Sequence, residues 1–294
     1  MKRASQPSIA ELQAASGRQK VSVIVTTFNE EVNIGECLES VAWADEVLVV
    51  DSFSTDRTIE IAQRYPVRLL QRQYFGSAAQ KNWSIDRVEH PWVLIIDADE
   101  RVPDELAREI LAVLAAPPTD VNGFYIRREN LFVDQVIHHS GWSTDKVVRL
   151  FRREKGRYPN RRVHADLEID GGPVPVLDHP FVHYTFRSFD QYFPKFLNYA
   201  EWGAAQAFRD GRQAGIFELV FRPLWRFIRT YFVQLGILDG KHGVVICALQ
   251  SFGVFLKYAR LWEHNIRKAR GEEVHLPAFD DEASTWKKPQ SEEA

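Results

Sequence analysis

The stretch that decides the fold is Trp92-Val93-Leu94-Ile95-Ile96-Asp97-Ala98-Asp99, an apolar run that ends abruptly in two carboxylates. A continuous apolar run of this length is typical of a strand that is buried on both faces of a parallel sheet. Side chains alternate along a strand, so Asp97 and Asp99 should project to the same side at its carboxyl end. That end is where open α/β sheets bind their ligands.

The two carboxylates predict a cation site. Like charges on one face repel each other unless a cation lies between them, and oxygen ligands suit Mg2+ or Mn2+. We therefore predict that Asp97 and Asp99 bind a divalent metal together with a diphosphate. The alternative is that they only solvate the strand end or cap the next helix. Pro103 argues against capping, because proline favours the first helical position and both aspartates precede it.

The residues before this strand alternate between expected strands and expected helices. Strands are expected at residues 21–28, 46–51 and 67–71, and helices near 34–41, 57–65 and from residue 76. This alternation predicts an α/β fold with a doubly wound, mostly parallel central sheet flanked by helices. The sequence contains neither G-x-G-x-x-G nor a Walker motif, which argues against an ordinary dinucleotide or ATP phosphate loop.

Composition and charge narrow the function classes. The chain has 294 residues, 45% of them hydrophobic, which is enough for a real core, and its net charge of -3 argues against a general nucleic-acid binder. Cys37 and Cys247 are the only cysteines and lie far apart, which indicates a reducing compartment. Residues 1–20 are polar, without the apolar segment of a secretory signal, and are expected to form a flexible arm. A flexible acidic tail is expected at residues 271–294.

Residues 189–270 are expected to form a helical, aromatic and basic appendage. On a helix from residue 216 to 235 three arginines share one narrow stripe flanked by aromatic side chains, which is typical of an interfacial helix on anionic lipid. The expected membrane-contact residues are Arg222, Trp225, Arg226 and Arg229. The alternative is a helical pair packed on the sheet with its arginines in solvent. Residues 244–256 lack charge but are shorter than the roughly 20 that span a bilayer, which predicts a buried or re-entrant helix.

Three motifs in order resemble the nucleotide-sugar signatures of family 2 inverting glycosyltransferases with the GT-A fold. They are Val23-Ile24-Val25-Thr26-Thr27-Phe28-Asn29-Glu30, Val50-Asp51-Ser52-Phe53-Ser54-Thr55-Asp56-Arg57-Thr58, and Asp97-Ala98-Asp99. Later motifs, among them Gly141-Trp142, Arg149-Leu150-Phe151-Arg152 and Leu238-Asp239-Gly240, are similar to a narrower branch, the bacterial lipopolysaccharide core β-1,4-glucosyltransferases and their relatives. The resemblance covers roughly residues 21–270, and it implies a GT-A nucleotide-sugar transferase domain at 21–188.

The resemblance also implies a donor and metal site. The residues expected to bind the donor nucleotide are Thr26, Phe28, Asn29, Glu30, Asp51, Asp56, Gln80, Lys81, Asn82 and Asp97. Among them Lys81 would lie near the diphosphate, and Asp97 would face the ribose or sugar. Asp99 would coordinate the metal, and His183 would complete the metal sphere. The alternative for His183 is a histidine within an aromatic cluster between Phe181 and Tyr184.

An inverting transfer also needs a general base that takes the proton from the acceptor hydroxyl, on the side of the sugar opposite the leaving diphosphate. Ser143 to Leu150 resembles the family stretch that carries this base, so Asp145 is the prediction, with Glu168 or Asp166 as substitutes. The narrower branch carries a glutamate after Val163-His164, where this chain has Ala165. The alternative for Asp145 is a surface ion pair with Lys146 or Arg149.

Together these implications predict a metal-dependent inverting hexosyltransferase. It would move a hexose, with glucose as the first candidate, from a UDP-sugar to a lipopolysaccharide-core or lipid-linked acceptor. The expected location is the cytoplasmic face of the cell membrane, with the protein bound peripherally to the anionic surface. The alternatives are transfer to a polyprenyl phosphate or a protein, and a non-catalytic nucleotide-sugar-binding assembly factor.

Overall fold

The computed structural model describes residues 7–159 and 166–277, which form two compact units. The described residues of the first, the sheet unit, are 7–128, 146–159 and 166–183. Those of the second, the helical unit, are 129–145 and 184–277. The predicted division at residue 188 was drawn on the linear sequence, whereas the segment 129–145 clusters with the helices.

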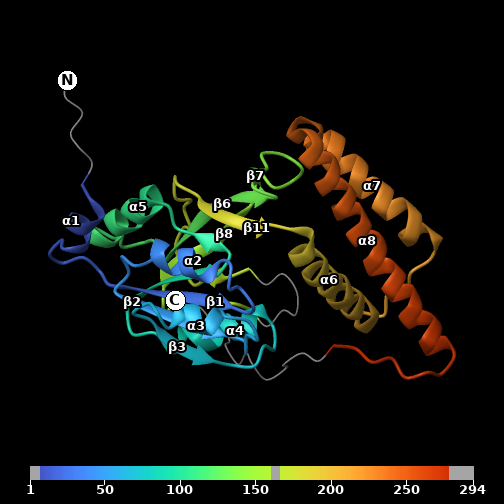
Figure 1. Cartoon of the computed structure of the whole chain (residues 1–294), viewed down its shortest axis with the longest axis horizontal. Coiled ribbons are helices and arrows are strands. Elements are labelled where there is room, and N and C mark those ends of the chain that lie inside the picture. The colour runs from blue at the N-terminus through green and yellow to red at the C-terminus, as the bar shows by residue number, and fades with distance from the viewer. Residues whose placement is uncertain (1–6, 160–165, 278–294) are drawn as a thin grey trace, which may run out of the picture. The chain divides into compact units, whose positions relative to one another are not determined.

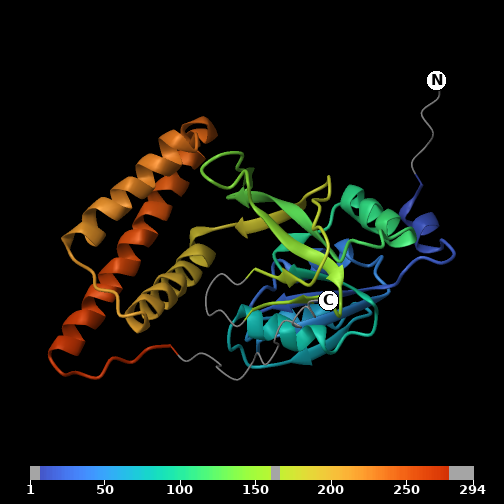
Figure 2. The same cartoon turned by 180° about the vertical axis from the view of Figure 1, so that it is seen from behind.

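The strands form one large mixed sheet, drawn in Figures 1 and 2. Its order is β3-β2-β1-β4-β8-β6-β11-β5, with β7 paired to β6, and a separate pair is formed by β9 and β10. The strands are β1 (Val21–Thr27), β2 (Glu46–Asp51), β3 (Arg68–Gln71), β4 (Trp92–Asp97), β5 (Glu100–Arg101), β6 (Gly123–Phe132), β7 (Gln135–Val136), β8 (Lys146–Arg152), β9 (Gly156–Arg157), β10 (Glu168–Ile169) and β11 (Phe181–Phe186). From β3 to β4 all pairs are parallel, which confirms the fold class predicted from the alternating pattern. The strand β8 then pairs antiparallel with both β4 and β6.

Helices cover both faces of the parallel part of the sheet. The helices of the sheet unit are α1 (Ile9–Gln13), α2 (Ile34–Ser40), α3 (Thr58–Ala62), α4 (Ser77–Ile85) and α5 (Asp104–Ala115). On one face α2 and α5 pack against alternate residues of β1 and β4, represented by Val25 and Ile96. On the other face Ile24 and Ile95 pack with Ile85 of α4. The central strands are therefore buried on both sides, as their unbroken apolar sequences predict.

Part of the expected flexible arm is ordered. A capping box joins Ser8 and Glu11 at the start of α1, and the side chain of Gln13 donates a hydrogen bond of 2.8 Å to the carbonyl of Trp43. The expectation of a loose arm is wrong for residues 7–20 because Ser8 and Glu11 satisfy the first amides of the helix, a signal that the polar composition hides. Residues 1–6 lie outside the described residues. So do residues 278–294, which are most of the acidic tail expected at 271–294.

The helical unit contains one long helix and two shorter helical segments packed along it (Figures 1 and 2). Its elements are α6 (Phe189–Arg209), the π-helix η1 (Phe217–Phe221), α7 (Arg222–Ile228), the π-helix η2 (Arg229–Val233), the 3-10 helix η3 (Gly236–Asp239) and α8 (Gly240–Ala269). The predicted helix at 216–235 is thus present with π turns at both ends. The uncharged residues 244–256, expected to form a buried or re-entrant helix, lie within α8, which is 30 residues long. By length and composition alone, the segment Gly236–Ala269 is long and apolar enough to cross a membrane.

Candidate active site

The centre of the site is Asp97, the last residue of β4. Parallel pairing places Thr26 of β1 beside it, and the Thr26 hydroxyl donates a hydrogen bond of 2.8 Å to Asp97 Oδ1. Lys81 Nζ, from α4, lies 3.0 Å from Oδ1, and Arg149 Nη2, from β8, lies 2.6 Å from Oδ2. Lys81 and Arg149 are both buried, whereas about a third of the Asp97 side chain (32%) is exposed. Asp97 is therefore a fixed carboxylate between two buried cations, with one edge accessible.

These contacts keep Asp97 ionised. Burial by itself would raise the pKa of its carboxyl, but the charges and hydrogen bonds of Arg149 and Lys81 outweigh burial and hold this pKa well below the ordinary value. The same pairing raises the pKa of Arg149 well above its ordinary value against the opposing effect of burial. An ionised, oriented carboxylate can accept hydrogen bonds from a sugar or ribose hydroxyl at any physiological pH.

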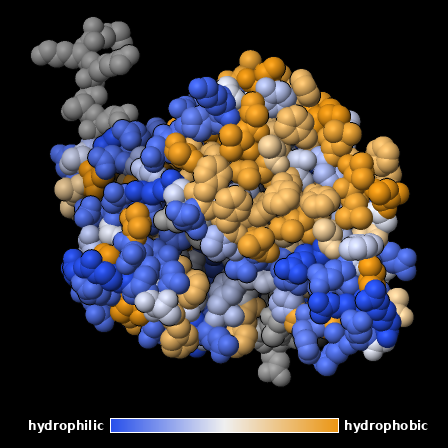
Figure 3. Space-filling model, turned by 45° about the vertical axis from the view of Figure 1, so that its right-hand side comes forward, coloured by the Kyte–Doolittle hydropathy of each residue, from blue (hydrophilic) through white to orange (hydrophobic). Residues whose placement is uncertain are grey.

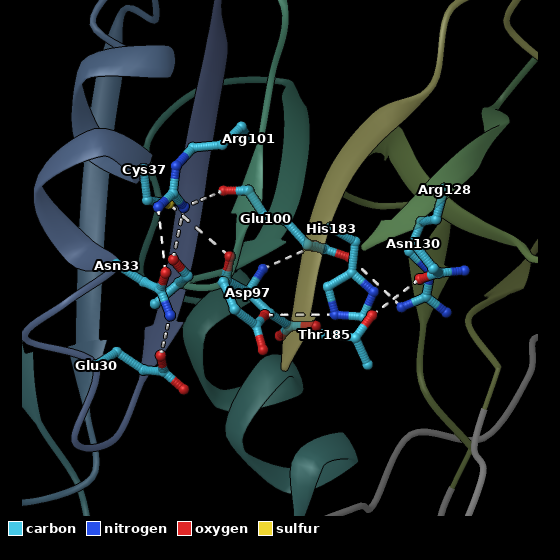
Figure 4. A network of polar contacts seen from close by, with 12 residues as sticks. Glu30, Asn33, Cys37, Asp97, Glu100, Arg101, Arg128, Asn130, His183 and Thr185 are labelled. Atoms are coloured by element: carbon cyan, nitrogen blue, oxygen red, sulfur yellow. Dashed lines mark hydrogen bonds and ion pairs between the residues drawn. The ribbon is translucent and has the colours of Figure 1, made fainter. Parts of the chain in front are cut away.

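A second buried carboxylate, Glu100, orders the turn after Asp97. Its Oε1 lies 3.2 Å from Arg149 Nη2 and 3.4 Å from Arg128 Nη1, and its Oε2 accepts a hydrogen bond of 2.9 Å from the Asp97 amide. Figure 4 shows Glu100 reaching back towards Asp97 within this network. The turn that contains Asp99 is therefore held from both sides by charge-assisted contacts.

Asp99, in the turn between β4 and β5, and His183, on β11, come close together. The strand β11 pairs antiparallel with β5, and His183 Nε2 lies 3.7 Å from Asp99 Oδ1. Burial would lower the pKa of His183, but its hydrogen bond to Asp99 and the charges of Asp99 and Glu100 raise this pKa above the ordinary value. Among residues 7–159 and 166–277 no cluster of three His, Cys, Asp or Glu side chains could enclose a metal. The two groups present, one imidazole and one carboxylate, fit a divalent cation whose other ligands come from a bound diphosphate.

This geometry bears on one part of the metal prediction, in which Asp97 stays a predicted ligand. Asp97 was predicted as a ligand together with Asp99 because both project to the same side of the strand end. In the structure Asp97 forms ion pairs with Lys81 and Arg149. The metal prediction assumed that a cation balances the negative charge of Asp97, whereas here these two side chains balance it. Asp99 and His183 are the other candidate ligands of the predicted cation.

Hydrogen bonds join the loop after β1 to the loop after β2. Asn29, which has a positive φ of 53°, accepts a hydrogen bond of 2.8 Å from the Thr55 amide, and its own amide donates one of 2.8 Å to Ser54 Oγ. The Glu30 amide donates a hydrogen bond to Thr58 Oγ1. Asp51 is fully buried and accepts a hydrogen bond from the Ser54 amide. The predicted nucleotide-binding motifs therefore form one connected rim.

Asp56 supports the same rim. It accepts hydrogen bonds from the amides of Glu31 and Thr58. Burial opposes ionisation, but the hydrogen bonds from Thr58 and Glu31 lower the pKa of Asp56 below its ordinary value. This arrangement agrees with a supporting role for Asp56 in the loop. Phe28 and Phe53, by contrast, expose about half of their side chains, and Phe53 has a positive φ of 62°.

The side chains expected from α4 divide between two roles. Gln80 donates a hydrogen bond of 3.3 Å to Ser52 Oγ, next to the β2 rim. Asn82 instead exchanges two hydrogen bonds of 2.9 Å with the backbone of Tyr158. Both polar groups of the Asn82 amide are thus used to hold the segment at residue 158. Of the three predicted residues of this helix, Lys81 has the direct contact with Asp97.

The three candidate bases lie in different surroundings. Asp145 belongs to the helical unit, where Asn130 Nδ2 donates a hydrogen bond of 3.0 Å to its Oδ2. Asp166 and Glu168 belong to the sheet unit, and both are exposed. The narrower branch carries its glutamate after a Val-His pair, and the matching residues here lie outside the described residues. They are Val163, His164 and Ala165. Asp145 is the candidate that a neighbouring side chain orients.

The sequence reasoning missed three charged residues of the site: Glu100, Arg128 and Arg149. For Arg149 the strand register explains the contact with Asp97. The register between β4 and β8 pairs Leu94 with Leu150, so Arg149 stands opposite Ile95, on the face that Asp97 shares. The sequence alone does not give this register, because β8 arrives antiparallel after a long connection.

The four predicted membrane-contact residues lie on the outside of the helical unit. The guanidinium of Arg222 lies 5.3 Å from the centre of the Tyr258 ring, and Arg226 Nη2 donates a hydrogen bond of 2.6 Å to Gln250. Trp225 and Arg229 are exposed. Two of the four, Arg222 and Trp225, line an open hollow of about 460 Å³. The other lining residues are Phe217, Phe221, Leu224 and Ile228.

Comparison with known proteins identifies relatives over most of the chain. The family model described as "Glycosyl transferase family 2" matches residues 22–193. The lipopolysaccharide core biosynthesis glycosyltransferase LpsC of Rhizobium meliloti is 28% identical over 90% of this chain and 97% of its own length. An uncharacterized glycosyltransferase of Rickettsia typhi is 27% identical over 85% of this chain and 89% of its own. Among solved structures, glucosyl-3-phosphoglycerate synthase from Mycobacterium tuberculosis, in complex with Mn2+ and UDP, aligns with a TM-score of 0.46 and 17% identity, covering 72% of this chain and 87% of that one.

Proposed function

Because the chain belongs to glycosyl transferase family 2, we propose that it transfers a hexose, with glucose as the first candidate, from a UDP-sugar to a lipopolysaccharide-core or lipid-linked acceptor with inversion at the anomeric carbon. The observation that carries this proposal is the arrangement at the end of β4. There Asp97 is fixed by Lys81 and Arg149, two residues before an Asp99 that lies 3.7 Å from His183.

On the donor side, each group has a distinct task. Asp97, ionised and partly exposed, accepts a hydrogen bond from a ribose or sugar hydroxyl and so orients the donor. Asp99 and His183 are the residues that would hold Mg2+ or Mn2+, which neutralises charge on the leaving diphosphate. From the resemblance to family 2 we infer that uracil and ribose bind at the rim formed by the loops at Asn29 and Ser54.

On the acceptor side, Asp145 takes the proton from the attacking hydroxyl. Asn130 donates a hydrogen bond to one of its oxygens and thereby fixes the rotation of the carboxylate. A base held in one orientation needs less reorganisation when the transition state forms. The proton passes from the hydroxyl to the Asp145 carboxylate while the hydroxyl oxygen bonds to the anomeric carbon and the bond from that carbon to the diphosphate breaks. The negative charge thereby ends on the departing diphosphate.

The acceptor class is supported by the relative and by the surface of the helical unit. LpsC, which matches 90% of this chain, is named for lipopolysaccharide core biosynthesis. Figure 3 shows apolar side chains gathered on one face of the molecule, over the helices of this unit. Its large apolar residues with at least half of the side chain exposed are Leu197, Tyr199, Ile216, Phe217, Phe221, Leu224, Trp225, Phe232, Val233 and Leu238. Exposed aromatic residues next to arginines suit the cytoplasmic face of an anionic membrane, where a lipid-linked acceptor resides.

The proposal is tested with a panel of UDP, GDP and dTDP sugars, measured by thermal shift with and without Mn2+. Binding to the folded state raises the apparent melting temperature, and we expect a shift with UDP-glucose that depends on Mn2+ and is lost in Asp99→Asn. Glu89→Gln is the matched control, because Glu89 is an exposed carboxylate that precedes the first residue of β4, at the opposite end of that strand. Equal shifts for all three nucleotides would refute the donor assignment. Transfer of radiolabelled glucose to a lipopolysaccharide-core fragment, but not to polyprenyl phosphate, would support the acceptor.

A further inference from the structure

A buried carboxylate in the helical unit, Asp239, has no part in the mechanism so far, although it lies in a motif that the resemblance singles out. It ends the 3-10 helix η3 and directly precedes α8. Only 4% of its side chain is exposed. At this position an aspartate would be expected to cap α8, but its side chain makes no capping hydrogen bond to that helix.

The Asp239 carboxylate instead binds the loop that precedes Asp145. Its Oδ1 accepts from the His138 amide at 3.2 Å and lies 3.0 Å from His139 Nδ1. Its Oδ2 accepts from the His139 amide at 3.1 Å and from the Ser140 hydroxyl at 2.9 Å. Four hydrogen bonds from three consecutive residues thus converge on one carboxylate, two on each oxygen.

Two backbone contacts of Ser140 complete the attachment. Its amide donates a hydrogen bond of 3.1 Å to the Gln234 carbonyl, and its carbonyl accepts one of 3.1 Å from Gln250 Nε2. Ser140 is fully buried and has a positive φ of 59°, a conformation that a serine keeps only where its surroundings enforce it. A Cβ atom added to Gly236 would lie 2.8 Å from the Ser140 hydroxyl, so a side chain at position 236 would crowd this hydroxyl.

From Ser140 the chain leads directly to the candidate base. The Trp142 amide donates to the His139 carbonyl at 3.0 Å, and the Asp145 amide donates to the Trp142 carbonyl at 3.2 Å. Each turn of the loop is therefore built on the previous one, and the first is held by Asp239. The carboxylate of Asp145 in turn accepts a hydrogen bond of 3.0 Å from Asn130 Nδ2.

We propose that Asp239 is a positioning residue of the transfer reaction, which fixes loop 138–145 on the helical unit and so sets the place of Asp145. This inference rests on the proposed function, in which Asp145 is the general base. A displacement of about 1 Å at a reacting group is enough to slow turnover by roughly two orders of magnitude. The carboxylate therefore acts on catalysis without touching a substrate.

The test compares Asp239→Asn with Asp210→Asn in the full chain. The asparagine is isosteric, but its amide group would face two donors where a carboxylate oxygen accepts. We expect hydrogen exchange in the peptide 138–145 to accelerate about tenfold or more, kcat to fall about 10- to 100-fold, and the KM for the UDP-sugar to stay within about twofold. Asp210 is the matched control, since it is exposed and accepts a hydrogen bond of 2.7 Å from Gln206 within the same unit. Its substitution should change neither exchange nor kcat.

Further measurements separate positioning from a general loss of stability. Ser140→Ala removes one of the four hydrogen bonds, so it should lower kcat by less than Asp239→Asn and add little in the double variant. The proposal is overturned if Asp239→Asn leaves exchange in the peptide 138–145 unchanged. It is also overturned if folded Asp239→Asn keeps its kcat while Asp145→Asn is inactive. Full turnover by Asp145→Asn would instead refute the base assignment of the proposed function, and the exchange data would still report whether Asp239 anchors the loop.

Discussion

Replacing Arg149 with methionine tests whether the charge cluster at the end of β4 is held together as described. The guanidinium lies 2.6 Å from Asp97 and 3.2 Å from Glu100, which at an effective dielectric constant of about 20 corresponds to attractions of roughly 6 and 5 kcal/mol. Desolvation of buried Arg149 and Glu100, and of the partly exposed Asp97, offsets most of this attraction, so the ion pairs add little net stability. Removing only the cation is different, because Glu100 is fully buried and keeps its desolvation cost. We expect the free energy of unfolding at pH 7 to fall by about 3–5 kcal/mol.

The assay is urea unfolding followed by tryptophan fluorescence, at several pH values. Asp97 has a pKa well below its value of about 3.9 in the unfolded chain, so its stabilising contribution is present above that value and is lost as the pH falls towards the folded-state pKa. The gap between the wild type and Arg149→Met should therefore be largest above about pH 5 and should narrow below pH 4. Lys155→Met is the control, because the more exposed Lys155–Asp170 pair contributes at most about 1 kcal/mol. A loss below about 1 kcal/mol at pH 7, or a gap that widens in acid, would refute this account of the cluster.

Three further predictions concern the candidate base, the arginine stripe of the helical unit and the turn between β6 and β7. Asp145→Asn should abolish turnover and leave the UDP-dependent thermal shift intact; retained turnover would remove Asp145 from the mechanism. Combined alanine substitution of the stripe Arg222, Arg226 and Arg229 should remove selective binding to anionic liposomes in a flotation assay, whereas equal binding to neutral liposomes would exclude an electrostatic contribution. Val133 and Asp134 join β6 to β7 with φ of 48° and 59°, so Asn-Gly at these positions should stabilise the protein against urea by about 1–2 kcal/mol; no gain would mean that the turn stores no strain.

The parallel half of the sheet could be predicted because its information is local. Each strand from residue 21 to 97 is an unbroken apolar segment that ends in a polar group, and short connections leave few ways to arrange such segments. The rim formed by the loops after β1 and β2 could be predicted for the same reason, since neighbouring parallel strands have their carboxyl ends at the same edge of the sheet. The ordered helix α1 was missed, although Ser8 and Glu11 have the spacing of a capping box.

The partners of Asp97 could be predicted only in part. Lys81 comes from the helix directly before β4, and the resemblance had placed it near the diphosphate. Arg149 comes from an antiparallel strand whose register is set by packing, so its contact with Asp97 had no local signal. Without that cation, two carboxylates on one strand face indicated a metal between them. In the structure Asp97 is paired with Arg149 and Asp99 faces His183, and the metal itself stays a prediction.

The arginine stripe is also less uniform than its spacing predicts. Arg226 donates a hydrogen bond of 2.6 Å to Gln250, whose amide donates in turn to the Ser140 carbonyl in the loop held by Asp239. Burial and the charge of Arg229 lower the pKa of Arg226, which is consistent with a guanidinium turned partly inward. Arg222 lies instead over the ring of Tyr258. Arg226 is therefore linked through Gln250 to loop 138–145, whereas Arg222 contacts Tyr258.

This difference gives a prediction that separates membrane binding from positioning. Arg226→Ala should weaken binding to anionic liposomes and also accelerate hydrogen exchange at residues 138–145, because Gln250 loses its partner. Arg222→Ala should weaken liposome binding to a similar degree and leave that exchange unchanged. Both variants are measured on the full chain, by flotation and by exchange of the same peptide. If the two arginines behave alike in both assays, the link from Arg226 through Gln250 to Ser140 does not constrain the loop, and Asp239 must hold it without help from the helix surface.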